Sequence, residues 1–388
     1  MARKHLAETI LLILVLVYTV NFINANIDPS EVKILPVREQ VLWTRGEADV
    51  HEYRIPVITS TVSGYLIAAV EARKYGSGDA SNKFLAVRRS KDGGKNWEPQ
   101  QFLLNDGPHV KDGVNLGAIL TDRETGVVFI NYITCGHNTD INCTASVHMI
   151  NSTDEGYTWN EPVNLTKQIG NAPFAAGPGY GIQKQYAPHK GRLIICGHVH
   201  LTGSQCILSD NHGLTWRFNI QGVYTIPYNQ TQKTGDFSPN ECQMVELPDG
   251  SIMLNSRNQY HYHCSCRIVA MSYDGAETFP IPYISFDEAL IEPACAAGLL
   301  YHQGIMFFTN PKNTKSREKL VLQWSFSNGT KWDNEYTLWP KLTAYSTLTA
   351  IPGYIAYEPY IYILYEKGSK EACESISLII VSIDGSIL

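Results

Sequence analysis

A short pattern recurs along this chain, and its spacing constrains the fold more than any other feature. In most copies a serine is followed by Asp or Asn two residues later, by Gly two residues further on, and by an aromatic residue at the eighth position. The copies begin at Ser90, Ser152, Ser209 and Ser272, and a degraded fifth copy begins at Ser325. Successive copies start 53 to 63 residues apart, which is typical of repeated supersecondary units. Because a period of about 60 residues fits a four-stranded blade with long loops, the sequence predicts an all-β, six-bladed β-propeller.

The repeat itself allows two interpretations, a hairpin clasp and a metal site. The Asp is placed to accept hydrogen bonds from backbone N–H groups in a tight turn, the Gly permits a positive φ there, and the aromatic ring covers apolar surface. A calcium site needs more carboxylates than the single one in each copy. Asn211 replaces the Asp in the third copy, and Ala276 replaces the Gly in the fourth. We therefore expect structural clasps and no metal.

Composition and charge narrow the possible functions. The 388 residues carry 31 basic and 37 acidic side chains, and the net charge of −6 argues against a nucleic-acid partner. The 22 tyrosines and the apolar runs at 191–196 and 360–365 favour β-strands over long helices. No linker or charge block interrupts the sequence, so we expect one closed domain over residues 26–388.

The first 25 residues have the pattern of a secretory signal peptide. Arg3, Lys4 and His5 form a basic start, residues 10–20 are apolar, and Ala25 offers a small residue for cleavage. The alternative is a membrane anchor, but this apolar run falls short of the roughly 20 residues that a spanning helix needs. Residues 1–25 are therefore predicted to be a signal peptide.

Five Asn-X-Ser/Thr sequons follow this segment and predict a glycosylated protein of the secretory pathway. Two of them lie at or inside a repeat copy, where an exposed hairpin turn would carry the sugar. The predicted glycosylation sites are Asn142, Asn151, Asn164, Asn229 and Asn328.

The chain has nine cysteines, so at least one thiol is free or paired outside the chain. Cys135 with Cys143, and Cys196 with Cys206, could each close a hairpin, although spacing does not determine connectivity. The segment 261–266, with two histidines and two cysteines, has the composition of a metal cluster. On a strand, however, the histidines would face one way and the cysteines the other, so we do not expect zinc there.

The motif Tyr53-Arg54-Ile55-Pro56 precedes the first repeat copy. Together with the repeats, which resemble Asp boxes, it resembles the exo-alpha-sialidase (neuraminidase) family. Segments 71–74, 177–182, 255–258 and 364–368 look most like the animal lysosomal sialidases. Asp boxes also occur in other propellers, so the Arg-Ile-Pro motif and the secretory signal make the resemblance specific. It extends over nearly the whole mature chain.

The resemblance implies a binding site for a carboxylate. Sialic acid carries a carboxylate on its anomeric carbon, and the family holds it with three arginines. Arginine suits this task because it stays charged and offers forked donors. By motif match, Arg54, Arg257 and Arg317 would form this clamp, although Lys315 and Lys319 crowd the register of Arg317.

The same carboxylate would repel a carboxylate nucleophile, whereas a neutral phenol avoids the repulsion. Sialidases use a tyrosine in place of the second carboxylate of other glycosidases. The resemblance implies that Tyr345 is the nucleophile and that Glu241 is the base that takes its proton. Asp79 would be the general acid/base, on a glycine-flanked loop that closes on the substrate. Glu366 would orient Arg54.

Further residues are expected around this centre. Glu71 and Arg73 would line the sugar pocket. Tyr180 could contact the sugar or the aglycone, or serve only in its turn. His198 and His200 could face the glycerol side of the sugar or only solvent.

The predicted function is a retaining exo-alpha-sialidase that removes terminal alpha-linked sialic acid from glycoproteins and oligosaccharides without a metal or organic cofactor. The alternatives are a catalytically inactive sialic-acid-binding lectin and a trans-sialidase. The resemblance also implies the lysosome lumen and a complex with a serine carboxypeptidase of the protective-protein type, and further suggests a galactosidase partner. Residues 382–388 contain no tyrosine for a sorting signal, so secretion stays open as an alternative.

Overall fold

The structure is a computed structural model that describes residues 29–107, 112–137, 143–200, 202–226, 236–353 and 359–388. Nearly every regular element in these ranges is a strand, as expected. The two helices among them are the short 3₁₀ turns η1 (Glu47–Asp49) and η2 (Ile281–Tyr283). Neither is long or apolar enough to cross a membrane. The predicted signal peptide lies outside the described residues.

Strand pairing groups the chain into five sheets. The first sheet contains β2 (Glu52–Ser60), β3 (Leu66–Arg73), β4 (Lys83–Ser90) and β5 (Gln101–Asn105). The second contains β6 (Val114–Thr121), β7 (Val128–Thr134), β8 (Ser146–Ser152), β9 (Val163–Asn164) and β11 (Gly179–Tyr180). The third contains β10 (Phe174–Ala176), β12 (Ile182–Gln183), β13 (Leu193–Val199), β14 (Gly203–Ser209) and β15 (Arg217–Phe218). The fourth contains β16 (Pro239–Glu246), β17 (Ile252–Asn258), β18 (Cys266–Ser272) and β19 (Ile284–Ile291). These four sheets follow each other in sequence, except that β11 of the second sheet lies between β10 and β12 of the third.

The fifth sheet has seven strands and joins the two ends of the described chain. Its members are β20 (Gly298–His302), β21 (Ile305–Pro311), β22 (Glu318–Ser325), β23 (Asn334–Ala350), β24 (Tyr360–Lys367), β25 (Ser375–Ser382) and β1 (Leu35–Thr44). The first half of β23 pairs with β22 and the second half pairs with β24, so one long strand serves two neighbouring sets of strands. The expected count of six separate blades therefore stays a prediction.

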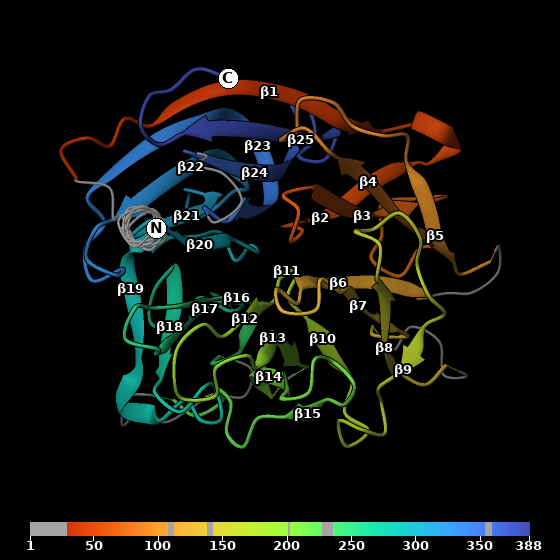
Figure 1. Ribbon diagram of the computed structural model, residues 1–388, viewed down its shortest axis with the longest axis horizontal. Coiled ribbons are helices and arrows are strands. Elements are labelled where there is room, and N and C mark those ends of the chain that lie inside the picture. The colour runs from red at the N-terminus through yellow and green to blue at the C-terminus, as the bar shows by residue number, and fades with distance from the viewer. Residues whose placement is uncertain (1–28, 108–111, 138–142, 201, 227–235, 354–358) are drawn as a thin grey trace, which may run out of the picture.

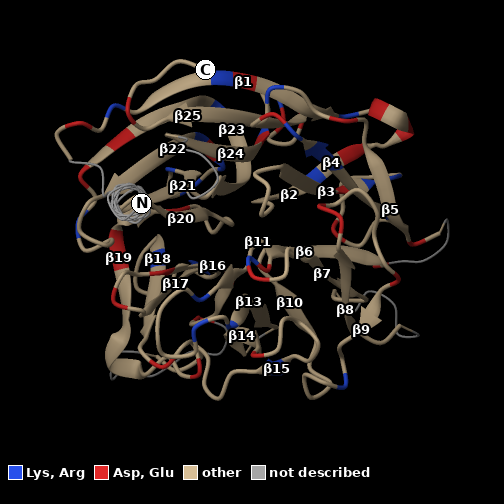
Figure 2. Ribbon diagram, viewed as in Figure 1, with Lys and Arg blue, Asp and Glu red and all other residues tan. Residues whose placement is uncertain are grey.

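The sheets form a ring (Figure 1). Strands β2, β11, β16 and β20 lie towards the middle, whereas β5, β9, β15 and β19 lie at the periphery. The ring closes where β1 pairs antiparallel with β25, which joins segments from opposite ends of the sequence. Lysines, arginines and acidic residues are scattered around the ring in this view (Figure 2), in line with the absence of a charge block in the sequence.

Adjacent sheets pack face to face and bury each other's apolar side chains, as β3 illustrates. All eight of its residues are buried. Ile67 and Ala69 belong to an apolar cluster shared with the second sheet, whereas Ala68 and Val70 belong to one shared with the seven-stranded sheet. Because side chains alternate across a strand, each face of β3 packs against a different neighbour.

The repeat copies are hairpin clasps, as the sequence predicts. Each of the five begins at the last residue of a strand, namely β4, β8, β14, β18 or β22. In the second copy, the Ser152 hydroxyl donates to Asp154 Oδ1 at 2.8 Å and accepts from the Gly156 N–H at 2.8 Å. The Thr158 N–H donates to Asp154 Oδ1 at 2.8 Å. Gly156 has a φ of 78°, and Ala276 in the fourth copy adopts 67° at the equivalent position.

A serine–aspartate turn that shares the first bond of the repeat follows β25, and the sequence analysis missed it. The Ser382 hydroxyl donates to Asp384 Oδ1 at 3.1 Å, with the same two-residue spacing as in the repeat copies, and Ser382 lies 57 residues after Ser325. The Ser386 N–H donates to Asp384 Oδ1 at 2.9 Å from two residues further on, whereas the Thr158 N–H in the second copy lies four residues after Asp154. The turn therefore shares only the start of the repeat pattern.

The cysteines follow the prediction only in part. Cys135 and Cys143 form a disulfide, as expected. The other pairing that the sequence left open, Cys196 with Cys206, does not form: both residues are buried free thiols although they are cross-strand partners in β13 and β14. Cys206 packs into the apolar core instead, with its Sγ 3.7 Å from Met244 Sδ.

The segment 261–266 also differs from its expected strand conformation. β18 begins only at Cys266, and the preceding residues form a turn in which His261 and His263 have positive φ values. Cys264 and Cys266 are bonded to each other as a disulfide, so their thiols are not available to a metal. Among the residues placed in the structure, no cluster of His, Cys, Asp and Glu could hold a metal ion.

Candidate active site

Tyr345 lies at the centre of the candidate site, where strands from three parts of the chain meet. Its hydroxyl donates a hydrogen bond to Oε1 of Glu241, which lies on β16. Arg257, on β17, donates from Nη1 to Glu241 Oε2 at 2.7 Å and to the Tyr345 oxygen at 3.2 Å. The structure therefore joins the predicted nucleophile, the predicted base and one predicted clamp arginine in one network.

The charges in this network favour a neutral phenol beside an ionised carboxylate. Burial raises the pKa of Tyr345 well above its ordinary value, and the negative charge of Glu241 raises it further. Burial also acts to raise the pKa of Glu241, but the Arg257 guanidinium and the hydrogen bond from Tyr345 outweigh it, so this pKa is lowered. The pair can pass a proton from the phenol to the carboxylate once the phenol oxygen forms a new bond.

Glu366 fixes two strands at the site. This fully buried residue of β24 accepts from Arg54 Nε at 2.6 Å and from the Ile55 N–H at 2.9 Å through Oε1. Its other oxygen accepts from the Tyr345 N–H at 2.9 Å. A single carboxylate therefore holds both the first clamp arginine and the backbone of the tyrosine, which extends the orienting role predicted for Glu366.

Irregular strand pairing sets the direction in which the side chains of Arg54, Glu241 and Tyr345 point. The pairing register shifts between Arg54 and Val57 in β2, between Pro239 and Cys242 in β16, and between Thr343 and Ser346 in β23. Bulges of this kind bend a strand and redirect its side chains. Ile55 has a φ of 58°, which is rare for a β-branched residue, and the Glu366 carboxylate satisfies its N–H. This geometry explains the Arg-Ile-Pro motif.

Arg317 completes a set of three arginines around the tyrosine ring. Its guanidinium carbon lies 5.4 Å from the centroid of the Tyr345 ring, and that of Arg54 lies 5.5 Å from it. Arg317 donates from Nη2 to the Ala294 carbonyl at 3.1 Å. The three predicted clamp residues thus converge, although they come from different sheets.

Asp79 lies on the loop between β3 and β4, and its side chain is 64% exposed. Arg73 donates from Nη2 to Asp79 Oδ1 at 2.7 Å and binds Glu71 Oε2 through Nε and Nη2. Burial acts to raise the pKa of Asp79, but Arg73 outweighs it, so this pKa is lowered and the free carboxylate is ionised. Arg73 is only 1% exposed and Glu71 is buried, so both residues support the Asp79 loop, and their predicted place in the sugar pocket stays a prediction.

The three further residues that the sequence placed near the sugar, Tyr180, His198 and His200, differ in their surroundings. The hydroxyl of Tyr180 donates to the Leu299 carbonyl at 2.6 Å, which favours its structural role. His198 faces the network, and burial lowers its pKa to about 4. Its Nδ1 is buried without a partner among the placed residues. His200 is exposed, as the solvent alternative requires.

The sequence analysis missed a second set of polar residues beneath the Asp79 loop. Lys83 is buried and donates from Nζ to the Asp79 carbonyl and to Asn115 Oδ1, the latter at 2.7 Å. Asn115 Nδ2 donates to Asp112 Oδ1 at 2.9 Å, and Asp112 in turn binds His137. Lys83 alone offered a signal, because it begins a largely apolar strand and a fully buried lysine is almost always paired.

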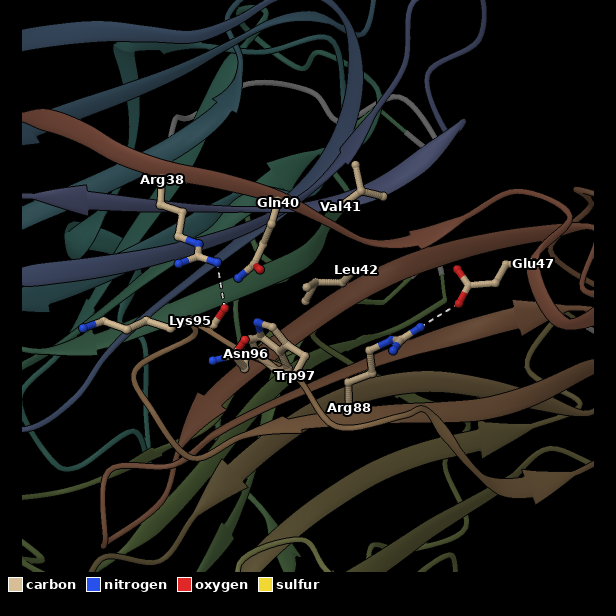
Figure 3. A pocket seen from close by; sticks show the side chains of 9 residues that line it. All are labelled: Arg38, Gln40, Val41, Leu42, Glu47, Arg88, Lys95, Asn96 and Trp97. Carbon is tan, nitrogen blue, oxygen red and sulfur yellow. Dashed lines mark hydrogen bonds and ion pairs between the residues drawn. The ribbon is translucent and has the colours of Figure 1, made fainter. Parts of the chain in front are cut away.

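A separate groove lies on the outer edge of the ring (Figure 3). It has a volume of about 360 Å³ and is lined by β1, Arg88 and the first repeat copy. Arg38 donates to the Lys95 carbonyl at 2.8 Å, and Arg88 pairs with Glu47 at 2.6 Å. None of its lining residues belongs to the candidate site, so this groove contributes nothing to the chemistry.

Three of the predicted glycosylation sites can be placed. Asn164 is exposed on β9, whereas Asn151 and Asn328 are half-buried at their hairpins. Asn151 Oδ1 accepts from Asn160 Nδ2 at 2.7 Å. Asn142 and Asn229 lie outside the described residues, and glycosylation at all five stays a prediction.

Comparison with known proteins identifies the class of protein. Residues 48–357 match the BNR repeat-like domain family. The sialidase of Micromonospora viridifaciens is 29% identical over 360 residues, which are 85% of this chain and 52% of that protein. Sialidase-3 of Rattus norvegicus is 26% identical, over 65% of this chain and 62% of that protein. The solved structure of the Hadza microbial sialidase Hz136 superposes with a TM-score of 0.72 at 24% identity, over 90% of this chain and 69% of that one.

The chain therefore belongs to the BNR repeat-like domain family, and its relatives there are sialidases, whose fold is a β-propeller. It spans about half the length of the Micromonospora relative. The mammalian relative named here is a Sialidase-3, so closeness to the lysosomal sialidases stays a prediction.

Proposed function

We propose that this chain is a retaining exo-alpha-sialidase that hydrolyses terminal alpha-linked sialic acid in glycoproteins and oligosaccharides. The observation that carries the proposal is the Tyr345 hydroxyl, which is bonded to Glu241 and Arg257 while Arg54 and Arg317 lie over its ring. Three arginines around a phenol suit a substrate that carries its carboxylate on the reacting carbon.

In the first step the Tyr345 oxygen attacks the anomeric carbon, and its proton passes to Glu241. The bond to the glycosidic oxygen breaks, and Asp79 protonates the departing alcohol. In the second step Asp79 takes a proton from water, which attacks the same carbon from the vacated side. The tyrosine oxygen leaves and recovers its proton from Glu241, so the product keeps its configuration.

Asp79 must therefore gain a proton before the first step. In the free chain Arg73 stabilises its ionised form. Binding of the sugar over this exposed carboxylate would exclude water and raise its pKa. An acidic compartment supplies the proton more readily than a neutral one.

The proposal is tested by incubating the chain with a fluorogenic alpha-sialoside between about pH 4 and pH 7. Release of the fluorophore with retention at the anomeric carbon supports it. Binding without turnover would instead indicate the lectin, and transfer of sialic acid to added lactose would indicate the trans-sialidase. A fluorinated sialosyl fluoride should label Tyr345, and a label on Glu241 or Asp79 would refute the tyrosine mechanism.

We further propose that the protein resides in the lysosome lumen and associates there with a serine carboxypeptidase of the protective-protein type. The sequons and the resemblance to lysosomal sialidases support this extension. Sensitivity of the expressed protein to a glycosidase, lysosomal fractionation and co-purification with the carboxypeptidase test it. Recovery of the protein only from the medium would contradict lysosomal residence.

A further inference from the structure

A histidine–aspartate pair that the proposed mechanism does not use lies beside the Asp79 loop. His137 Nδ1 lies 2.6 Å from Asp112 Oδ1, and the His137 backbone N–H donates to Asp112 Oδ2 at 2.5 Å. The Asp112 side chain is 1% exposed, whereas that of His137 is 43% exposed. The imidazole therefore reaches solvent while its carboxylate partner is buried.

Hydrogen bonds connect this pair to the loop by two routes. The backbone N–H of Asp112 donates to the carbonyl of Ala80, the residue that follows Asp79, at 3.0 Å. In the second route, Asn115 bridges Asp112 to Lys83, whose ammonium group binds the Asp79 carbonyl. A change in the charge of the pair therefore acts on the two successive backbone carbonyls of Asp79 and Ala80.

The pair is held in place by the backbone around it. Asp112 has a φ of 59° and Cys135 a φ of 58°, which are uncommon values for these residues. The Cys135 N–H donates to the Asp112 carbonyl at 2.6 Å, and Cys135 is bonded to Cys143. Such backbone conformations persist when the surroundings fix them, and they are frequent at functional sites.

His137 interacts electrostatically with four titratable groups of the described chain, namely Asp112, Asp79, Lys83 and His198. The hydrogen bond that His137 donates to Asp112 raises the pKa of His137, burial lowers it, the Asp79 carboxylate raises it, and Lys83 lowers it, with a net increase. His198 on β13 is affected by the His137 charge. His137 also lowers the pKa of Asp79, after the larger effects of burial, Arg73 and Arg54.

We propose that His137, as an imidazolium ion held on Asp112, is a positioning residue that keeps the Asp79 loop against the site. This inference rests on the proposed role of Asp79 in hydrolysis. In the free chain, where Asp79 is ionised, charged His137 attracts both Asp112 and Asp79, and so draws the loop towards the network that contains Lys83 before the substrate binds. A neutral imidazole keeps its hydrogen bond to Asp112 but loses this attraction.

The direction of the pH effect follows from the charges. Because the pKa of His137 is raised above its ordinary value, the imidazolium is fully present in acid and is lost as the pH rises through the raised pKa. The positioning effect is therefore present at acidic pH and absent at alkaline pH.

The chain offers a matched control in His212. Its Nδ1 lies 2.9 Å from Asp122 Oδ2, and the two side chains are 42% and 0% exposed, so this pair resembles His137 and Asp112 closely. His212 belongs to the third repeat copy, and its ring contacts Asp122 and Glu124, neither of which is a residue of the candidate site. A purely structural effect of a half-exposed histidine on a buried aspartate should be the same in both pairs.

The experiment compares kcat/KM of the wild type, His137→Gln and His212→Gln from about pH 4 to pH 8. The ratio of wild type to His137→Gln should be about fivefold or more in acid and should approach one at pH 8, because small misplacements of catalytic groups slow reactions strongly. The ratio for His212→Gln should stay near one throughout. A ratio for His137→Gln that does not change with pH would overturn the proposal.

A second measurement does not depend on turnover or on the histidine variants. NMR titration of the histidine ring protons should show that Asp79→Asn lowers the pKa of His137, because the variant removes a carboxylate that raises it. An unchanged His137 titration would overturn the coupling. If the chain hydrolysed no sialoside, the proposed function would fail, whereas this titration would still decide whether His137 and the Asp79 loop interact.

Discussion

The hydroxyl of Tyr345 donates to the carboxylate of Glu241 although 104 residues separate them in the sequence. Each residue lies within a shift in strand register, and Arg257 binds both of them. A buried phenol that is bonded to an ionised carboxylate is prepared to lose its proton during a reaction and not before it. This relationship leads to the first prediction.

Tyr345→Phe should lose most hydrolytic activity and keep its affinity for a sialic-acid-like inhibitor. The phenylalanine ring retains the packing between Arg54 and Arg317, but it has no oxygen to attack the substrate. Steady-state kinetics and calorimetric titration of the inhibitor test this. A variant with near-normal kcat would show that Tyr345 is not the nucleophile.

Arg54→Lys and Arg257→Lys should each lower kcat/KM by roughly 100-fold while the protein stays folded. Lysine keeps the charge, but it cannot bind Glu366 or Glu241 and also present a planar fork to a carboxylate. Arg88→Lys is the control, because Arg88 pairs with Glu47 in the outer groove. Equal losses in all three variants would argue against the clamp.

Asp79→Asn should lose far more activity on sialyllactose than on an aryl sialoside. A phenolate leaving group departs without a proton, whereas the alcohol of lactose needs one from Asp79. In the wild type, kcat/KM should fall in strong acid as Glu241 becomes protonated, and the lowered pKa of Glu241 moves this fall below its ordinary range. Similar losses of Asp79→Asn on both substrates would exclude an acid role for Asp79.

Glu292→Gln should weaken inhibitor binding, because a buried ion pair joins two parts of the clamp. Glu292 accepts from the N–H of Asn258, which follows Arg257, at 2.6 Å and pairs with Arg267 at 2.6 Å. Arg267 in turn binds the Cys295 carbonyl, next to the Ala294 carbonyl that holds Arg317.

The control for this prediction is Glu246→Gln, which disturbs the buried pair of Lys184 and Glu246 away from the site. Both variants should lower the melting temperature, since each leaves a buried cation without its partner charge. Only Glu292→Gln should also raise the dissociation constant of the inhibitor. Equal dissociation constants in the two variants would assign Glu292 to stability alone.

Asp154→Ala should lower the free energy of unfolding by about 1 kcal/mol, as the loss of a comparable side-chain cap does. Asp154→Asn should cost less, because Asn211 keeps the equivalent bond to the Thr215 N–H at 3.0 Å. Thermal unfolding measures both effects, and kcat of the folded variants should stay unchanged. A loss of stability on adding EDTA, reversed by calcium, would contradict the clasp interpretation.

The sequence by itself determined the repeat, its period and the strand-rich fold, because a clasp depends on local hydrogen bonds between residues two to four positions apart. Ser152, Asp154 and Thr158 carry all they need within one turn. The resemblance further indicated Arg54, Glu241, Arg257, Arg317, Tyr345 and Glu366, and the structure brings these residues together.

Only the tertiary structure decided what depends on packing between distant segments. The free state of Cys196 and Cys206, the disulfide between Cys264 and Cys266, and the burial of Arg73 beneath Asp79 leave no local signal. The same holds for His137, whose pairing with Asp112 joins the segment before β6 to the segment after β7. Closure of the ring brings such segments together, and their charges then act on each other across distances that sequence separation does not reveal.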